Sequence, residues 1–157
     1  MGKRLLVLLL SVAALAATTV GIALAQGRGG TAESQVIHVV VGPRSEDEFL
    51  DFAGDGLGFG DRLVARGPLF DPSQTTRVGT AHLDCVISSQ VLAGGTFNCT
   101  YVLKLEDGDI MTHGIDPQGP SRVLFAVTGG TGSYRHATGQ AEYIDTDVTD
   151  IIIDLEG

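Results

Sequence analysis

The sequence predicts an all-β domain, and three features support this. No segment after Ala25 repeats its apolar residues with the 3.6-residue period of a helix. The expected extended segments are four to thirteen residues long, typical of strands, and the clearest of them alternate between apolar and polar residues. Turns rich in Gly, Pro and Asp separate these runs at short intervals. Seven or eight short strands joined in this way indicate a sandwich or a barrel.

The N-terminal segment differs from the rest of the chain. Lys3 and Arg4 precede an apolar stretch, Leu5–Ala25, that ends in the small-x-small sequence Ala23–Ala25. This order is typical of a secretory signal peptide spanning residues 1–25, and it predicts a secreted, extracellular protein that leaves the membrane after cleavage. The alternative is an uncleaved anchor, because the apolar stretch just reaches the roughly 20 residues that a membrane-spanning helix needs.

Cleavage would leave 132 of the 157 residues. Residues 26–34 are polar and Gly-rich, which predicts a disordered linker, and residues 35–157 suffice for one domain. The leader takes two of the ten basic residues and none of the 19 acidic ones, so the formal net charge changes from −9 to −11. Such an acidic surface argues against nucleic acids and anionic membranes as partners.

The first half of the domain contains three expected strands. Val36–Val41 is a short apolar run, and Phe49–Phe52 is a short extended piece that follows a break rich in Gly, Pro and charge. Residues 53–61 hold four glycines and are expected to form a loop. Arg62–Phe70 is the next strand, and Asp71–Gln74 has the composition of a turn.

Two segments with a period of two, Arg77–Ser89 and Thr96–Leu105, should form a hairpin around the Ala93–Gly95 turn. Small or apolar residues share one face of the first segment: Gly79, Ala81, Leu83, Cys85 and Ile87. Apolar residues also share one face of the second: Phe97, Cys99, Tyr101, Leu103 and Leu105. We expect these two faces to point into the core.

The last part of the chain completes the sheet. Ile110–Ile115 and Val123–Val127 are expected strands. The glycines within 129–132 should bend the chain sharply, because glycine adopts positive φ without steric cost. Thr138–Asp145 and Val148–Leu155 follow as the final strands.

Three segments resemble one known superfamily. Thr128–Gly139 (TGGTGSYRHATG) resembles the GGTG-x-[FY]-R-x-A-x-G segment of the allene oxide cyclase and dirigent proteins. Gly60–Val64 with Pro68–Asp71, and then Val78–Cys85, are similar to two strands of that family in the same order. The resemblance extends from Val36 to the C-terminus, and it implies an eight-stranded antiparallel β-barrel of the calycin type. Such an interior is filled by side chains or holds one small ligand.

Cys85 and Cys99 lie on the inward faces of the two hairpin strands. Because the leader directs the chain to an oxidising compartment, a disulfide between them is one expectation. The resemblance offers another, since Cys85 aligns with a cysteine that lines the pocket of plant allene oxide cyclases. In that case both thiols would be free.

The resemblance also bears on catalysis. Plant allene oxide cyclases hold a water with polar residues at the positions of Val41, Pro43 and Gly67, which are not matched here. Dirigent proteins place arginines after the glycine turn, and Arg135 matches the first whereas Thr138 replaces the second. A cyclase-like isomerase activity therefore stays open, with no complete catalytic set.

Arg135 and Tyr101 are the catalytic candidates. Arg135 would either carry a positive charge into a pocket or donate hydrogen bonds to carbonyl groups at a barrel end. Tyr101 would either offer its hydroxyl to a ligand or fill the core. The residues expected to line a ligand cavity are Leu83, Cys85, Phe97, Tyr101 and Phe125.

No cofactor or metal is expected. The four histidines, at positions 38, 82, 113 and 136, are scattered without metal-binding spacing. The aspartates at 145, 147, 150 and 154 are interpreted as a solvated rim, with weak calcium binding as the alternative.

Three functions fit these features. The barrel could bind a small hydrophobic molecule and steer its cyclisation, isomerisation or stereoselective coupling by confinement. It could instead carry or sense such a molecule without catalysis, or be a structural surface protein with a filled interior. Plant relatives are often dimers or trimers, so the resemblance also implies possible self-association.

Overall fold

The computed structural model describes residues 34–89, 95–117 and 122–156, and it confirms an all-β chain. The strands are β1 (Gln35–Val41), β2 (Glu46–Leu50), β3 (Arg62–Phe70), β4 (Arg77–Ile87), β5 (Phe97–Leu105), β6 (Gly108–Asp116), β7 (Arg122–Gly130), β8 (Thr138–Asp145) and β9 (Thr149–Glu156). One 3₁₀ turn, η2 (Gly132–Tyr134), lies between β7 and β8. The expected leader, nearly all of the linker and most of the Ala93–Gly95 turn lie outside the described residues. Within those residues, no helix is long and apolar enough to span a membrane.

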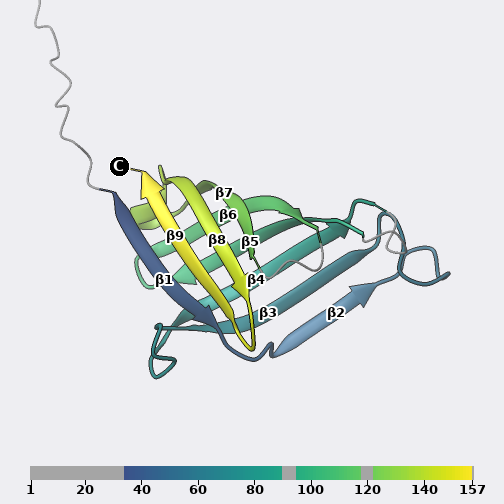
Figure 1. Ribbon diagram of the computed structural model, residues 1–157, viewed down its shortest axis with the longest axis horizontal. Coiled ribbons are helices and arrows are strands. Elements are labelled where there is room, and N and C mark those ends of the chain that lie inside the picture. The colour runs from purple at the N-terminus through teal and green to yellow at the C-terminus, as the bar shows by residue number, and fades with distance from the viewer. Residues whose placement is uncertain (1–33, 90–94, 118–121, 157) are drawn as a thin grey trace, which may run out of the picture.

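Eight strands form a closed antiparallel barrel, as the sequence predicts (Figure 1). Strands β3 to β9 pair with their neighbours in chain order, and β1 pairs with β9. Two residue pairs, Val40 with Phe70 and Val41 with Leu69, join β1 to β3 and close the cylinder. Closure leaves only short free strand edges, which protects the sheet from pairing with other chains.

The chain from β1 to β2 behaves as one bent strand along β3. The Gly42 N–H donates to the Pro68 carbonyl at 2.9 Å, and the Ser45 N–H donates to the Arg66 carbonyl at 2.9 Å. Pro43 and Arg44 bulge out between these two bonds. Beyond the bulge, β2 pairs with β3 alone and runs away from the β8–β9 turn (Figure 1). Among the described strands none pairs with the other edge of β2, and we call this end of the barrel the open end.

This arrangement corrects the expected position of the second strand. The strand was expected at Phe49–Phe52, but β2 begins at Glu46 and ends at Leu50. Its charged residues are exposed while their backbone groups continue the ladder with β3. Ladder hydrogen bonds to a neighbouring strand therefore outweigh the weak strand propensity of Glu and Asp here.

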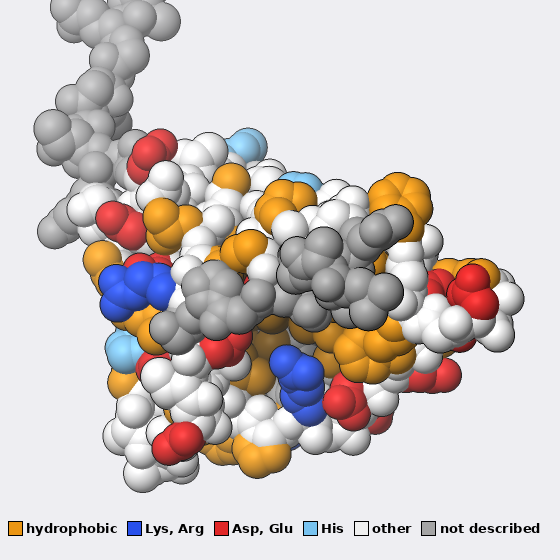
Figure 2. Space-filling view, turned by 45° about the vertical axis from the view of Figure 1, so that its right-hand side comes forward, with side chains coloured by type: hydrophobic (Ala, Val, Ile, Leu, Met, Phe, Trp, Pro, Cys, Tyr) orange, Lys and Arg blue, Asp and Glu red, His pale blue; other side chains and the backbone are white. Residues whose placement is uncertain are grey.

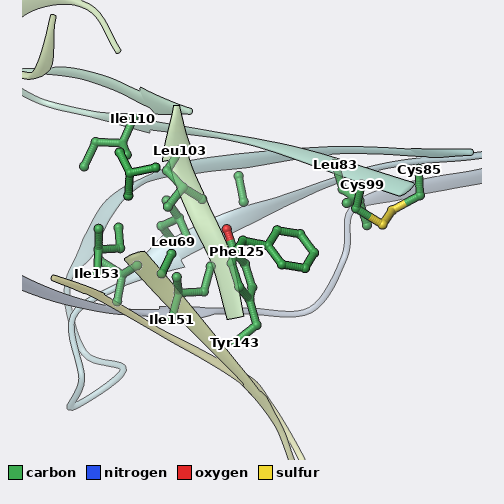
Figure 3. Packing of buried hydrophobic residues seen from close by; sticks show 14 of the residues in the cluster. Leu69, Leu83, Cys85, Cys99, Leu103, Ile110, Phe125, Tyr143, Ile151 and Ile153 are labelled. Carbon is green, nitrogen blue, oxygen red and sulfur yellow. A yellow bond between two sulfur atoms is a disulfide. The ribbon is translucent and has the colours of Figure 1, made fainter. Parts of the chain in front are cut away.

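The core is aliphatic at one end of the barrel and aromatic nearer the other. Fully buried aliphatic side chains fill the closed end, where β1 pairs with β3: Leu69, Leu103, Ile110, Ile151 and Ile153. Figure 3 shows Phe125 and Tyr143 between this cluster and the cysteine pair. The interior of the closed end is therefore filled by side chains.

The glycine segment adopts positive φ at two positions, as expected. Gly129 has φ +131° beside a register shift in the β6–β7 ladder, although β7 continues to Gly130, and Gly132 has φ +57° at the turn itself. A Cβ at Gly130 would lie 2.1 Å from the Asp109 carbonyl oxygen, and one at Gly132 would lie 2.3 Å from that of Asp107. These glycines allow the β7–η2 turn to pack directly on the β5–β6 turn, because any side chain would collide with backbone.

The disulfide between Cys85 and Cys99 is present. The two residues face each other across β4 and β5, with Cα atoms 4.1 Å apart, and both side chains are buried. Among the described residues no cysteine is free. The alternative of two free thiols is therefore wrong for this structure.

Candidate ligand-binding site

A small pocket opens into the barrel at its open end. Its volume is about 20 Å³, enough for one water molecule. It is lined by Val41, Arg44, Ala65, Arg66, Gly67, Ala81, Leu83, Tyr101 and Thr149. Three of these, Ala65, Gly67 and Ala81, are small residues on inward positions of β3 and β4. Their size leaves the space that Tyr101 of β5 faces.

Three aromatic rings form a cluster behind this pocket. The ring centroids of Tyr101 and Tyr143 are 4.4 Å apart, those of Phe125 and Tyr143 are 4.8 Å apart, and those of Tyr101 and Phe125 are 5.8 Å apart. All three pairs are tilted, an arrangement that aromatic rings favour. The cluster presents an apolar, polarisable surface to the open end of the barrel.

Two features of β6 fix the cluster. The hydroxyl oxygens of buried Thr112 and Tyr143 are 2.6 Å apart and share a hydrogen bond. Gly114 leaves room for the Phe125 ring, because a Cβ at that position would lie 2.4 Å from its Cδ1 atom. Two inward positions of β6 therefore fix the rings. Thr112 holds Tyr143 by a hydrogen bond, and Gly114 leaves space for Phe125 because it has no side chain.

The tyrosines of the cluster stay protonated at neutral pH. Burial raises the pKa of Tyr101 above its ordinary value, the negative charges of Asp145 and Asp116 raise it further, and the positive charge of Arg44 acts against them. Burial likewise raises the pKa of Tyr143. Both phenols are therefore weak acids that keep their protons, so each can donate a hydrogen bond and neither is available as a general base.

Two polar groups in the pocket lack protein partners. The Tyr101 hydroxyl has no hydrogen bond, and the Arg44 guanidinium has neither an ion pair nor a hydrogen bond, within the part of the chain that the structure describes. Thr149, in contrast, donates its hydroxyl to Asp145 at 2.5 Å. Figure 2 shows a hollow on one face of the molecule where hydrophobic side chains lie beside basic and acidic ones.

Comparison with known proteins finds solved structures with a similar barrel. No family model and no curated protein matches the chain. Among solved structures, a pyocyanin demethylase superposes with a TM-score of 0.68 at 20% identity, over 77% of this chain and 99% of its own. The chain has the allene oxide cyclase and dirigent barrel fold.

Two further structures share this fold. A pterocarpan synthase dirigent protein has a TM-score of 0.62 at 19% identity, over 78% of this chain and 86% of its own. An exo-specific intermolecular Diels-Alderase has a TM-score of 0.62 at 20% identity, over 80% of this chain and 99% of its own. The resemblance noted in the glycine segment is therefore confirmed at the level of fold.

The expected cavity residues all point inward on this dirigent-like barrel, but they do not share one pocket. Leu83 and Tyr101 line the pocket, and Phe125 contacts the Tyr101 ring behind it. Cys85 and Phe97 are buried, with 3% and 5% of their surface exposed, and are not part of the pocket lining. The cavity expected from sequence is thus only partly the pocket that the structure forms.

The two catalytic candidates lie apart. Arg135 is exposed just after η2, at the closed end of the barrel, whereas Tyr101 faces the pocket at the open end. Val41 and Gly67, two of the positions where allene oxide cyclases carry polar groups, do line the pocket. Sequence reasoning missed Arg44 and Thr149, although the Gly-Pro break at 42–43 signalled a bulge that would direct Arg44 away from the ladder.

Two aspartates of the acidic C-terminal stretch contact neighbouring side chains. No group of three or more His, Cys, Asp or Glu side chains that could hold a metal ion occurs in the described ranges. Asp150 instead pairs with His38, whose Nε2 lies 2.8 Å from the carboxylate. This pair links β1 to β9 on the partly exposed outer face of the barrel.

Proposed function

We propose that the barrel binds a small hydrophobic molecule at its open end, with the apolar part of the ligand against the Tyr101 ring, which Phe125 and Tyr143 support from behind. The observation that carries this proposal is the contrast between the two ends. Fully buried aliphatic residues fill the closed end, whereas the open end combines an aromatic cluster with three small inward residues, Ala65, Gly67 and Ala81. Small-molecule sites are typically concave, mostly apolar and supplied with a few polar groups.

The structural neighbours support small-molecule chemistry on this fold. Their names describe a demethylase, a pterocarpan synthase and a Diels-Alderase. We infer that the present barrel, if catalytic, would steer a cyclisation, isomerisation or coupling by orienting its substrate. Restricting conformation and fixing reacting groups lowers a barrier without acid–base chemistry.

The chemistry of the pocket is consistent with orientation. No carboxylate is part of the pocket lining, and Tyr101 is not available as a general base because its raised pKa keeps the phenol protonated. A non-catalytic carrier would use the same surface. The small volume of about 20 Å³ favours a further candidate, a structural barrel with a filled interior.

We also propose that the chain is exported and works outside the cytoplasm, without nucleic-acid partners, as a monomer or a small homo-oligomer. The Cys85–Cys99 disulfide supports this, because such bonds persist in oxidising compartments. Mass spectrometry of the expressed protein tests the export: the expected mass lacks residues 1–25, and a retained leader would contradict cleavage.

A neutral fluorescent arene, N-phenyl-1-naphthylamine, tests ligand binding. We expect its fluorescence to rise on binding to the wild-type barrel and to be lost in Ala65→Leu, which fills the pocket. Val64→Leu places the same leucine side chain on the opposite side of β3 and serves as the control for position. Circular dichroism confirms that both variants fold.

Equal binding by both variants would place the dye elsewhere, and no binding by wild type would favour the filled barrel. Independently of the dye, mass spectrometry of molecules extracted from the native protein would identify a bound ligand. Turnover of a polyene epoxide or of phenoxyl radicals would separate an enzyme from a carrier.

A further inference from the structure

We propose that Arg44 and Tyr101 form an oxyanion-recognition site at the open end of the barrel. The ligand would then be an amphiphile, with an aromatic or polyene body and a carboxylate, phenolate, enolate or sulfonate oxygen. This inference rests on the proposed function, since it assigns a ligand class to the same pocket.

The backbone places Arg44 at the opening. The residue lies in the bulge between Gly42 and Ser45, both of which donate backbone hydrogen bonds to β3. The bulge packs against Gly67 of β3: a Cβ there would be in ordinary van der Waals contact, 3.4 Å from the Gly42 oxygen and 3.7 Å from the Arg44 Cα. An anchored bulge therefore holds an exposed arginine against the pocket.

The guanidinium is available to a ligand. Three of the six arginines in the described ranges pair with a carboxylate: Arg62 with Asp84, Arg66 with Glu46 at 3.9 Å, and Arg122 with Glu142 at 3.0 Å. Arg44 has no such carboxylate partner within the described ranges, although the chain carries a net charge of −9. A planar guanidinium suits the recognition of oxyanions, because it donates two parallel hydrogen bonds.

Tyr101 supplies a second donor on the same pocket. Its hydroxyl is protonated at neutral pH and has no hydrogen-bond partner among the described residues. The nearby Asp145 is not part of the lining and accepts the Thr149 hydroxyl. Two unpartnered donors and no lining carboxylate thus favour an anionic oxygen, while the aromatic cluster would contact the body of the ligand.

Two dyes with the same ring system test this site. 1-Anilinonaphthalene-8-sulfonate carries an anionic group that the neutral N-phenyl-1-naphthylamine lacks. We expect Arg44→Gln to weaken binding of the sulfonate about tenfold, in line with a charge-assisted hydrogen bond, and to change the affinity for the neutral dye less than about twofold. Tyr101→Phe should weaken sulfonate binding by a smaller factor, and Arg44→Lys should restore part of the affinity.

Arg135→Gln is the matched control, because Arg135 is also exposed and lacks an ion pair within the described ranges but lies at the closed end. Its affinities for both dyes should equal those of wild type. Phe52 and Phe59 are 69% and 77% exposed and can bind dyes non-specifically, so only the signal lost in Ala65→Leu is counted.

The outcomes separate the two proposals. If both dyes bind in the pocket and Arg44→Gln leaves the sulfonate affinity unchanged, or lowers both affinities equally, the oxyanion site is wrong and the hydrophobic site stands. If neither dye gives a signal that Ala65→Leu removes, both proposals fail.

Discussion

The Thr112 and Tyr143 hydroxyl oxygens lie 2.6 Å apart inside the barrel, on strands that are not neighbours. Thr112 belongs to β6 and Tyr143 to β8, with β7 between them. Thr112 is fully buried, and Tyr143 is 2% exposed. Because each hydroxyl satisfies the other, two polar groups can occupy a mostly apolar core. The bond also fixes the ring that contacts both Tyr101 and Phe125.

This pair predicts the effect of Thr112→Val. The substitution keeps the shape of the side chain but leaves the Tyr143 hydroxyl buried without a partner, so the free energy of unfolding should fall by about 1–3 kcal/mol. Urea denaturation followed by circular dichroism measures the change. The double variant Thr112→Val/Tyr143→Phe removes both hydroxyls and should be more stable than the sum of the single changes implies. Strict additivity would show that the bond contributes nothing.

Much of the fold could be predicted from sequence because burial imposes a period of two. The boundaries of Arg62–Phe70 and Thr138–Asp145 agree with β3 and β8. The inward faces of β4 and β5 also agree, and they bring Cys85 and Cys99 together. These patterns are local, since one face of each strand packs on the core and the other meets solvent.

The candidate site was harder to predict, because its residues come from separate strands and a bulge. Tyr101 and Leu83 were found through their inward positions. The size of the pocket, however, also depends on Ala65 and Gly67 of β3. The position of Arg44 depends on a bulge whose flanking hydrogen bonds join distant segments. No local pattern encodes such pairings.

The disulfide should make a large contribution to stability. In the chain-entropy model, closing a loop of this length stabilises a protein by about 3 kcal/mol, and the separation here is 14 residues. We expect the double variant Cys85→Ala/Cys99→Ala to lose about 2–4 kcal/mol in denaturant titrations. Reductant should destabilise the wild type and leave the variant unchanged. Thiols that titrate in unreduced, unfolded wild type would contradict the bond.

The glycine segment predicts a contrast between two Gly→Ala variants. Gly130→Ala places a Cβ 2.1 Å from the Asp109 carbonyl oxygen, so the β5–β6 turn must shift, at a cost of about 1–3 kcal/mol or more. Gly54 has φ +73°, but the Cβ of an alanine there would have no neighbouring atom within 4 Å. Gly54→Ala should therefore cost only the backbone strain, about 1–2 kcal/mol. Thermal unfolding compares the two, and a smaller loss for Gly130→Ala would show that the turns do not pack as closely as described.

Alkaline pH should unfold the barrel through its tyrosines. Burial raises the folded-state pKa of Tyr101 and Tyr143 above the ordinary value of 10.0. Their contribution to stability is therefore fully present below pH 10 and is lost as the pH rises toward the folded-state values. Each tyrosine removes up to about 1.4 kcal/mol per pH unit in that interval, which is large against a total stability of about 5–15 kcal/mol.

We expect tyrosinate absorbance to rise in the same pH interval in which near-ultraviolet circular dichroism is lost, because the phenols ionise only when the barrel opens. Tyr101→Phe removes one of these titrating groups without leaving a buried partner unsatisfied, since no described residue bonds to its hydroxyl. Its alkaline midpoint should therefore lie above that of wild type. The third tyrosine, Tyr134, lies outside the cluster, so the titration is made in a Tyr134→Phe background. Tyrosinate formation near pH 10 with the circular dichroism intact would then mean that the Tyr101 and Tyr143 rings are accessible to solvent, and the aromatic cluster would not be the packed floor of a pocket.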